Sequence, residues 1–111
     1  MNFDILNKKL LKRLNDPAET VKAYGKPVAR RIHQRLQEFE AAESLEIIRM
    51  LPAANCHELT GKDAGFLAVD VSANYRMIIA PKKTPPPEKE DGGLDWSAVT
   101  EIVIHDIIDY H

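Results

Sequence analysis

The side chains best suited to chemistry gather at the last residues of this chain. The sequence closes with IHDIIDYH, in which Asp109, Tyr110 and His111 supply a carboxylate, a phenol and an imidazole. Upstream, the second half of the chain offers His57 and Arg76. Histidine titrates near neutral pH, and arginine presents a two-pronged donor that matches phosphate oxygens. These residue types are suited to chemistry on a phosphate group, but taken by itself the closing triplet is more simply interpreted as a frayed polar terminus.

The stretch before the triplet predicts a fixed support for it. VTEIVIHDII is rich in β-branched residues and apolar on both faces, which is typical of a strand inside a sheet. We expect ladder hydrogen bonds to hold this strand to about residue 108. If the strand stays extended, alternation places one set of side chains on one face: His105, Ile107, Asp109 and His111. Tyr110 and Ile108 then lie on the other face. Because the rest of its strand is apolar, we assign His105 to a structural role.

A hairpin and a loop come before that strand. GFLAVDV and ANYRMIIA alternate between the two faces and follow each other almost without a gap, which predicts two antiparallel strands. Residues 82–97 then contain three consecutive prolines and a glycine pair, so we expect an exposed loop there. Trp96 is the predicted packing anchor that holds this loop to the sheet.

The first half of the chain carries helical patterns. Leu6, Leu10 and Leu14 recur every four residues, as on one face of a helix. NDPAE then predicts a second start, with Asp16 as the N-cap and Pro17 at the first helical position. The following segment, KPVARRIHQRLQEFEAA, combines an apolar stripe with a basic side. The cations assigned to that basic side are Lys26, Arg30, Arg31 and Arg35.

Helices first and strands afterwards predict an α+β fold. We expect one domain over residues 1–111, with a helical part in 1–51 and a sheet part in 56–111. The helices should pack on one face of a small antiparallel sheet. Within that sheet we expect the last strand to lie next to the hairpin.

The composition excludes several classes of protein. The chain has 111 residues, of which 44% are apolar and 29% charged, as in an ordinary single domain. No run approaches the roughly 18 apolar residues of a membrane span. The one cysteine, Cys56, has no disulfide partner and the four histidines show no zinc-ligand spacing, so we expect a cytoplasmic protein without a metal site.

The charge of the chain is unevenly distributed. The net charge is −2, but residues 1–50 carry 10 Lys and Arg against 7 Asp and Glu. Residues 51–111 carry 5 against 10. A polyanion is therefore expected to approach the first half, where the basic helix side is either a solvated face or a docking surface.

Three motifs, in this order, resemble a known family. CHEL followed by a glycine, then NYR, then the closing DYH are similar to the HigB branch of the RelE/ParE superfamily of toxin–antitoxin toxins. The likeness covers about the whole chain, and the PPP…DGGLDW insertion resembles sequences labelled killer proteins. It implies a RelE/ParE-like fold and a ribosome-dependent endoribonuclease that cleaves translated mRNA without a cofactor. The implied partners are the ribosome, mRNA and a cognate helix-turn-helix antitoxin.

The resemblance assigns the catalytic positions to His57, Arg76, Asp109, Tyr110 and His111. In metal-free RNA cleavage the ribose 2′-OH attacks the adjacent phosphorus, and two histidines can share the acid and base roles. A guanidinium stabilises the added charge. A tyrosine ring can stack a splayed base, which is worth roughly 1–3 kcal/mol, and a carboxylate can orient an imidazole.

One position departs from the family pattern. Thr60 stands where the family usually has a lysine, and Lys62, two residues later, is the candidate substitute for contacting RNA. One acid–base pair supplies only about 10²–10⁴-fold, so a ribosome that holds the substrate fits the small site. The basic residues Lys26, Arg30, Arg31 and Arg35 are then the candidate contacts with ribosomal RNA.

Two other functions on the same scaffold stay open. The chain could be a gyrase-inhibiting toxin of the ParE kind. It could also be a decayed toxin that only binds an antitoxin and helps to repress its operon. Thr60 and the excess of acidic residues in the second half of the chain favour these alternatives. An autonomous nucleic-acid-binding regulator is disfavoured because no recognition helix is apparent.

Overall fold

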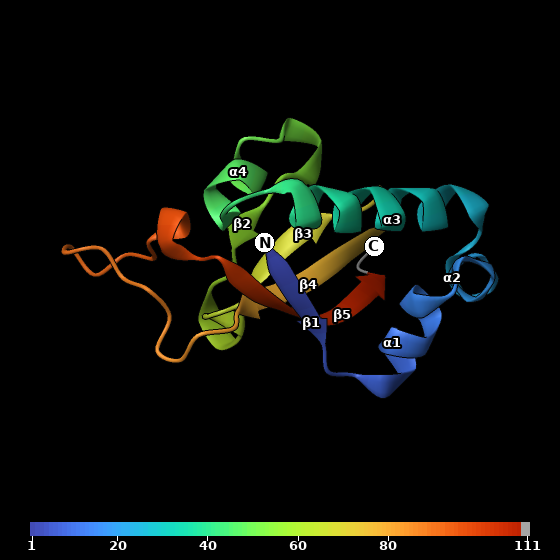
Figure 1. Ribbon diagram of the computed structural model, residues 1–111, viewed down its shortest axis with the longest axis horizontal. Helices are drawn as coiled ribbons and strands as arrows, with labels where there is room; N and C mark the ends of the chain where they lie inside the picture. The colour runs from blue at the N-terminus through green and yellow to red at the C-terminus, as the bar shows by residue number, and fades with distance from the viewer. Residues whose placement is uncertain (110–111) are drawn as a thin grey trace.

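A five-stranded sheet forms the centre of the molecule (Figure 1). The computed structural model describes residues 1–109. The strand order is β1-β5-β4-β3-β2, so the most apolar strand lies inside the sheet, as predicted. The strands are β1 (Asn2–Ile5), β2 (His57–Glu58), β3 (Leu67–Asp70), β4 (Tyr75–Pro81) and β5 (Glu101–Asp109).

The N-terminal residues correct the expectation of a purely antiparallel sheet behind an all-helical first half. Asn2–Ile5 form an edge strand that runs parallel to β5, with Phe3 opposite Ile102. The remaining strand pairs are antiparallel, so the sheet is mixed. The reason is tertiary, because Asn2–Ile5 precede the helical spacing that begins at Leu6 and gain their strand conformation by pairing with β5.

Four helices follow the first strand and make up most of the first half. Asn7 caps α1 through its side-chain oxygen, and Asp16 caps α2 in the same way, with Pro17 in the first turn as predicted. Gly25, with a φ of 85°, separates α2 from α3. The helices are α1 (Lys8–Asn15), α2 (Pro17–Tyr24), α3 (Lys26–Ala41) and α4 (Leu45–Arg49).

The helices and one face of the sheet share a single hydrophobic core. Ile32 and Phe39 of α3 are fully buried in it, together with Met77, Ile79 and Ile104 of the sheet. This arrangement confirms the α+β class. Within residues 1–109, no helix combines the length and the apolar character that a membrane crossing requires.

The segment 82–97 projects from one end of the molecule, away from α1 and α2 (Figure 1). Most of its residues are exposed, as predicted, and a bridge between Glu88 and Leu94 draws its two arms together. Trp96 is only 6% exposed and packs under the Arg49 guanidinium, which lies 4.6 Å from the ring centre. Trp96 therefore anchors the loop, and it does so against α4 as well as the core.

Candidate functional site

Strand register places several of the predicted residues on one face of the sheet. His57 pairs with Ala68, Ala68 with Ile78, and Ile78 with Asp106. Directly paired residues point to the same side, and Arg76, two residues before Ile78, shares that side. We name it the open face, because the shared core lies on the other side of the sheet.

His57 stands at one edge of the open face. Its side chain is exposed, and Nδ1 lies 2.7 Å from the backbone oxygen of Asn55. Because a carbonyl can only accept a hydrogen bond, the neutral ring carries its proton on Nδ1 and leaves the Nε2 lone pair available. This is the arrangement that a general base requires.

Arg76 lies near the start of β4, the central strand in the sheet order, and belongs to the open face. It is half-buried and lies opposite Asp70 on one side and Ile108 on the other. Two strand spacings and two residues separate it from His57, which gives about 12 Å between the two Cα atoms. The two side chains can therefore reach one extended substrate, but they do not form a compact pair.

A β-bulge changes what the last strand presents. Ile104 pairs with Ile79 and Asp106 pairs with Ile78, so His105 is an extra residue without a partner of its own in the ladder. The expectation that His105 shares a face with Ile107 is therefore wrong. Ile104 and Ile107 are both buried, whereas His105 is exposed.

The bulge brings a further imidazole near the open face, which alternation alone did not reveal. The His105 ring packs edge-on against Phe66, with centroids 5.0 Å apart and planes at 89°. Phe66 is half-buried and immediately precedes β3. The contact supports the structural role assigned to His105, although the ring also remains exposed to solvent.

Strand β5 is held to its last described residue. Asp109 pairs with Tyr75, and the Tyr75 ring packs edge-on against Tyr24 of α2 at 5.6 Å. The pairing places Asp109 on the side of Tyr75, opposite to that of Arg76. The hydrogen-bonded strand predicted to hold the closing triplet is thus present up to Asp109. Tyr110 and His111 lie outside the described residues, and their catalytic roles stay predictions.

Arg35 is a correction to the predicted basic surface. It is only 1% exposed, and its Nε donates to the Asp70 carbonyl at 2.8 Å while Nη2 donates to the Ala53 carbonyl at 3.0 Å. Nη1 bridges to Glu38 at 2.9 Å. Three residues from Ile32, Arg35 falls inside the apolar stripe of α3, and there its guanidinium donates to two backbone carbonyls instead of lying on the exposed basic side.

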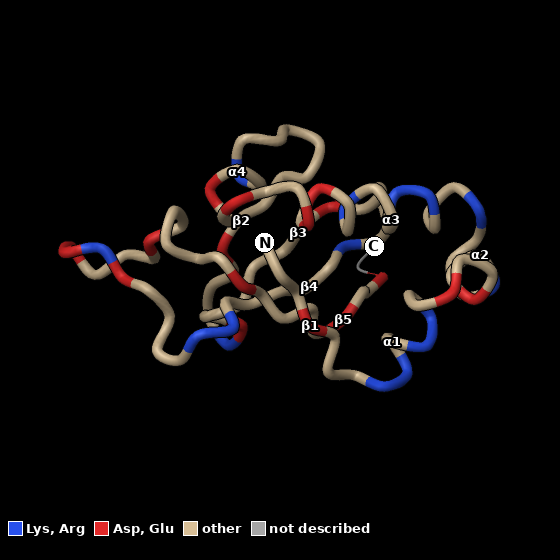
Figure 2. Tube along the Cα trace, viewed as in Figure 1, with Lys and Arg blue, Asp and Glu red and all other residues tan. Residues whose placement is uncertain are grey.

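The other three basic residues of α3 are exposed, as predicted, and they belong to a larger positive surface. Figure 2 shows Lys and Arg gathered over α1, α2 and the first half of α3. The charge excess of the first half indicated this surface, but the α1 and α2 residues were not singled out. The exposed or half-buried cations of this basic end are Lys8, Lys9, Lys12, Arg13, Lys22, Lys26, Arg30 and Arg31.

Lys62 and Thr60 lie on the turn between β2 and β3. Both are exposed, and Lys62 is part of a short 3₁₀ turn, Gly61–Asp63. The Phe66 amide closes this turn by donating to the Asp63 carbonyl at 3.1 Å. Lys62 is accordingly held near the His57 edge of the sheet, and its contact with RNA stays a prediction.

Cys56 borders the same edge but is unsuited to nucleophilic chemistry. Burial raises the pKa of its thiol to about 12, an effect that nearby Arg49 opposes and Glu58 adds to. At neutral pH the sulfur is therefore a protonated thiol, which is a poor nucleophile.

Solved structures identify the fold. One is a YoeB/ParE toxin from Agrobacterium tumefaciens, which matches over 100% of both chains with a TM-score of 0.58 and 10% sequence identity. The chain has the fold of this toxin. A second is a YoeB-YefM complex from Staphylococcus aureus, which matches over 100% of this chain and 97% of the other, with a TM-score of 0.55 and 12% identity.

The comparison with YoeB/ParE toxins confirms the predicted RelE/ParE-like fold. At identities of 10% and 12% the likeness concerns the fold, and activity has to be argued from the residues of this chain. No protein-family model matches the sequence. No curated protein matches it either.

Proposed function

We propose that this chain is the toxin of a type II toxin–antitoxin system and that it cleaves translated mRNA on the ribosome. The supporting observation is the pairing of a toxin fold over the full chain with an open sheet face that carries His57 and Arg76. The HigB-like motifs CHEL, NYR and DYH contribute the residues of this face and of the adjoining strand end.

The proposed chemistry divides the transition-state tasks among these side chains. His57, with its Nε2 lone pair available, takes the 2′-OH proton or returns one to the leaving oxygen. Arg76 stabilises the charge that develops on the phosphate oxygens. His111 shares the acid–base work, Tyr110 stacks a base, and Asp109 orients an imidazole.

The openness of this arrangement supports the proposed dependence on the ribosome. His57 and Arg76 stand on a sheet surface about 12 Å apart, so an isolated RNA strand would be poorly oriented between them. A ribosome that holds the RNA in a reactive orientation can lower the activation barrier by several kcal/mol. The exposed residues Lys26, Arg30 and Arg31 are proposed to contact ribosomal RNA.

The proposal is tested by inducing the chain alone in a bacterial host. We expect growth arrest together with new mRNA 5′ ends inside translated frames, mapped by primer extension. Arg76→Ala and His111→Ala should each lower cleavage by about 10²-fold or more. The matched control is Lys89→Ala, because Lys89 is an exposed residue of the 82–97 loop. This variant should cleave mRNA like the wild type. Unchanged toxicity in both site variants would contradict the assigned site.

A gyrase-inhibiting or decayed toxin is the second candidate. Thr60 favours it, because the exposed turn lacks the lysine that the ribonuclease pattern places there. The same induction separates the candidates. Growth arrest with DNA damage and intact mRNA would select gyrase inhibition, and no arrest would select the decayed toxin.

An antitoxin is the proposed protein partner. The Staphylococcus aureus structure with this fold is a complex of YoeB with YefM. Because a structure with this fold is a complex with a second protein, we propose that a cognate helix-turn-helix protein binds and neutralises this chain.

A further inference from the structure

Two aromatic side chains meet over the open face, and the proposed chemistry uses neither of them. The Phe66 and His105 rings lie with their centroids 5.0 Å apart and their planes at 89°. Because perpendicular rings touch edge to face, the contact covers at most one face of one ring. His105 is exposed and Phe66 is half-buried, so part of the remaining ring surface faces solvent.

Strand register explains how these two residues, which are distant in the chain, come together. Phe66 precedes Ala68 by two residues, and Ala68 pairs with His57, so alternation places Phe66 on the open face. The Leu59 amide donates to the Phe66 carbonyl at 2.9 Å, which extends the ladder between β2 and β3 to this residue. Only β4 lies between β3 and β5. The contact with His105 therefore spans two strand spacings, about 10 Å, and passes over β4.

The sheet beneath the two rings carries small apolar side chains. Ala80 of β4 pairs with Val103 of β5, and the register between β3 and β4, continued by one residue, places Phe66 beside Ala80. A methyl group on the middle strand leaves room for the two rings above it. Ala68 and Val103 belong to the same face and are only 0% and 7% exposed. We name Phe66 and His105 the aromatic pair.

The aromatic pair lies in line with the residues of the proposed site. Ala80 follows Arg76 by four residues, which is about 13 Å along β4. His57 pairs with Ala68, and Ala68 pairs with Ile78, so His57 stands at a level between Arg76 and Ala80. An RNA strand that runs along β4 would meet Arg76 first, then the level of His57, and then the aromatic pair. A phosphate can contact the guanidinium while a base of the same strand reaches the rings.

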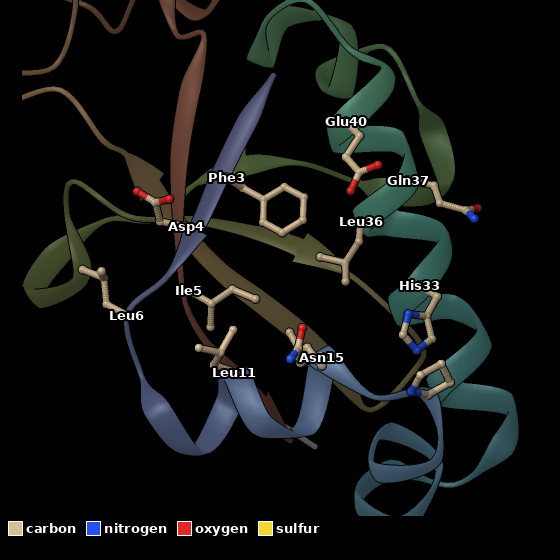
Figure 3. Close-up of a pocket in the computed structure, with 12 residues that line it drawn as sticks. Phe3, Asp4, Ile5, Leu6, Leu11, Asn15, His33, Leu36, Gln37 and Glu40 are labelled. Atoms are coloured by element: carbon tan, nitrogen blue, oxygen red, sulfur yellow. The ribbon is translucent and has the colours of Figure 1, made fainter.

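A groove on another part of the surface suits RNA less well. It opens between β1, α1 and α3, where Phe3, Leu11 and Leu36 point into it (Figure 3). Among the described residues, those that line it include the carboxylates of Asp4 and Glu40 and no lysine or arginine. These carboxylates repel phosphates, whereas the open face offers a guanidinium together with aromatic rings.

We propose that Phe66 and His105 bind a nucleobase of the mRNA by stacking, close to the phosphate that Arg76 contacts. This inference deepens the proposed function and rests on it, because it names a base-binding position of the same site. The base is a second one, in addition to the base assigned to Tyr110. Every base has a π-face, so stacking tolerates any base. The aromatic pair therefore positions the RNA strand and does not select a codon.

Cleavage of a defined mRNA on purified ribosomes tests the inference, with kcat and KM measured separately. Phe66→Ala and His105→Ala should each raise the KM by about fivefold or more, the loss expected for one stacked base, with a much smaller change in kcat. Phe66→Tyr keeps an aromatic ring and should raise the KM less than Phe66→Ala. Met50→Ala is the matched control, because Met50 is 66% exposed at the end of α4 and lies outside the open face.

Abasic nucleotides in the mRNA give a signature that a purely structural role would not produce. Each base near the cleaved phosphate is removed in turn. One abasic position should lower kcat/KM of the wild type by about fivefold or more. The same substrate should cause no further loss in Phe66→Ala, because the ring that stacks on this base is already gone. Met50→Ala should respond to the abasic position as the wild type does.

Thermal melts identify the variants that fold, and His105→Ala removes an exposed ring, so it tests the inference even where Phe66→Ala unfolds. A wild-type KM in the folded alanine variants would overturn the inference. So would an equal abasic effect in Phe66→Ala, or the absence of any abasic position that slows the wild type. In these cases mRNA cleavage by the wild type leaves the proposed ribonuclease standing. A wild type that cleaves no mRNA on ribosomes would overturn the proposed function, and this inference with it.

Discussion

Arg35 illustrates how the role of a charged residue depends on its place in a helix. Four arginines and lysines of α3 look equivalent in the sequence, yet one of them is buried against the end of β3. Its guanidinium joins three segments of the chain through the Asp70 carbonyl, the Ala53 carbonyl and the Glu38 carboxylate. Arg35 therefore stabilises the fold and does not belong to the proposed RNA-binding surface.

Replacing Arg35 tests this assignment. Arg35→Ala leaves two partly buried hydrogen bonds to the Asp70 and Ala53 carbonyls unmade and one carboxylate without its cation. It should lower the free energy of unfolding by about 3 kcal/mol or more. Arg31→Ala, on the exposed side of the same helix, is the control and should change it by about 0.5 kcal/mol or less. Urea denaturation measures both, and equal effects would show that the buried contacts contribute little.

At the scale of elements, the bulge in β5 decides which residues the sheet presents. Without it, strict alternation would carry the register set by Ile104 to Asp106 and Ile108, which would put a carboxylate into the core. With His105 inserted, Ile107 turns inward and Asp106 turns to the open face. The extra residue therefore shifts the alternation of β5 by one position. Ile104 before the bulge and Ile107 after it can both face the core.

Deleting His105 should consequently be tolerated. The deletion removes the unpaired residue and lets Ile104 and Asp106 follow each other in a regular ladder, so the shortened chain should fold and melt cooperatively. Deleting Val103, two residues earlier, is the control. That deletion moves a whole set of side chains to the wrong face and should abolish cooperative melting. Circular dichroism during heating distinguishes them, and an unfolded His105 deletion would contradict this account of the register.

The sequence predicted the parts of the fold that local patterns specify. The interior position of β5, the hairpin and the Asp16 cap follow from composition, alternation and side-chain chemistry near each residue. Strand β1 did not follow, because four residues gain their conformation from pairing with β5, about 100 residues away in the chain. The bulge and the burial of Arg35 were hidden for the same reason, since each depends on contacts across the sheet or with a neighbouring element.

The candidate site was predictable in residue type but not in geometry. Alternation within one strand cannot tell which neighbour it faces, and only the register between β2, β3 and β4 places His57 and Arg76 on one face. That register also gives their wide separation. The motifs thus predicted a chemistry, and the strand register sets the distance that a substrate of the proposed reaction would have to span.

At the scale of the whole molecule, positive charge is concentrated at one end. The cations of α1, α2 and α3 cover the end next to the last described residues of β5, whereas the 82–97 loop at the other end carries four carboxylates, Glu88, Glu90, Asp91 and Asp95 (Figure 2). Contacts within the molecule connect the basic end to the strand end. Arg13 lies 5.6 Å from the Tyr24 ring, which packs on Tyr75 opposite Asp109. An RNA attracted to this end would therefore arrive beside the Asp109 end of β5, on the sheet side opposite to that of Arg76.

Salt dependence of ribosome binding tests whether this polarity matters. For each RNA phosphate that a variant no longer neutralises, the slope of log K against log salt should fall by about 0.7–0.9. Arg30→Glu with Arg31→Glu should therefore weaken co-sedimentation with ribosomes and flatten its salt dependence. Lys83→Glu with Lys89→Glu changes the net charge equally at the other end, where both residues are exposed, and is the matched control. If both pairs weaken binding to the same extent, overall charge governs the encounter and the basic end has no specific role.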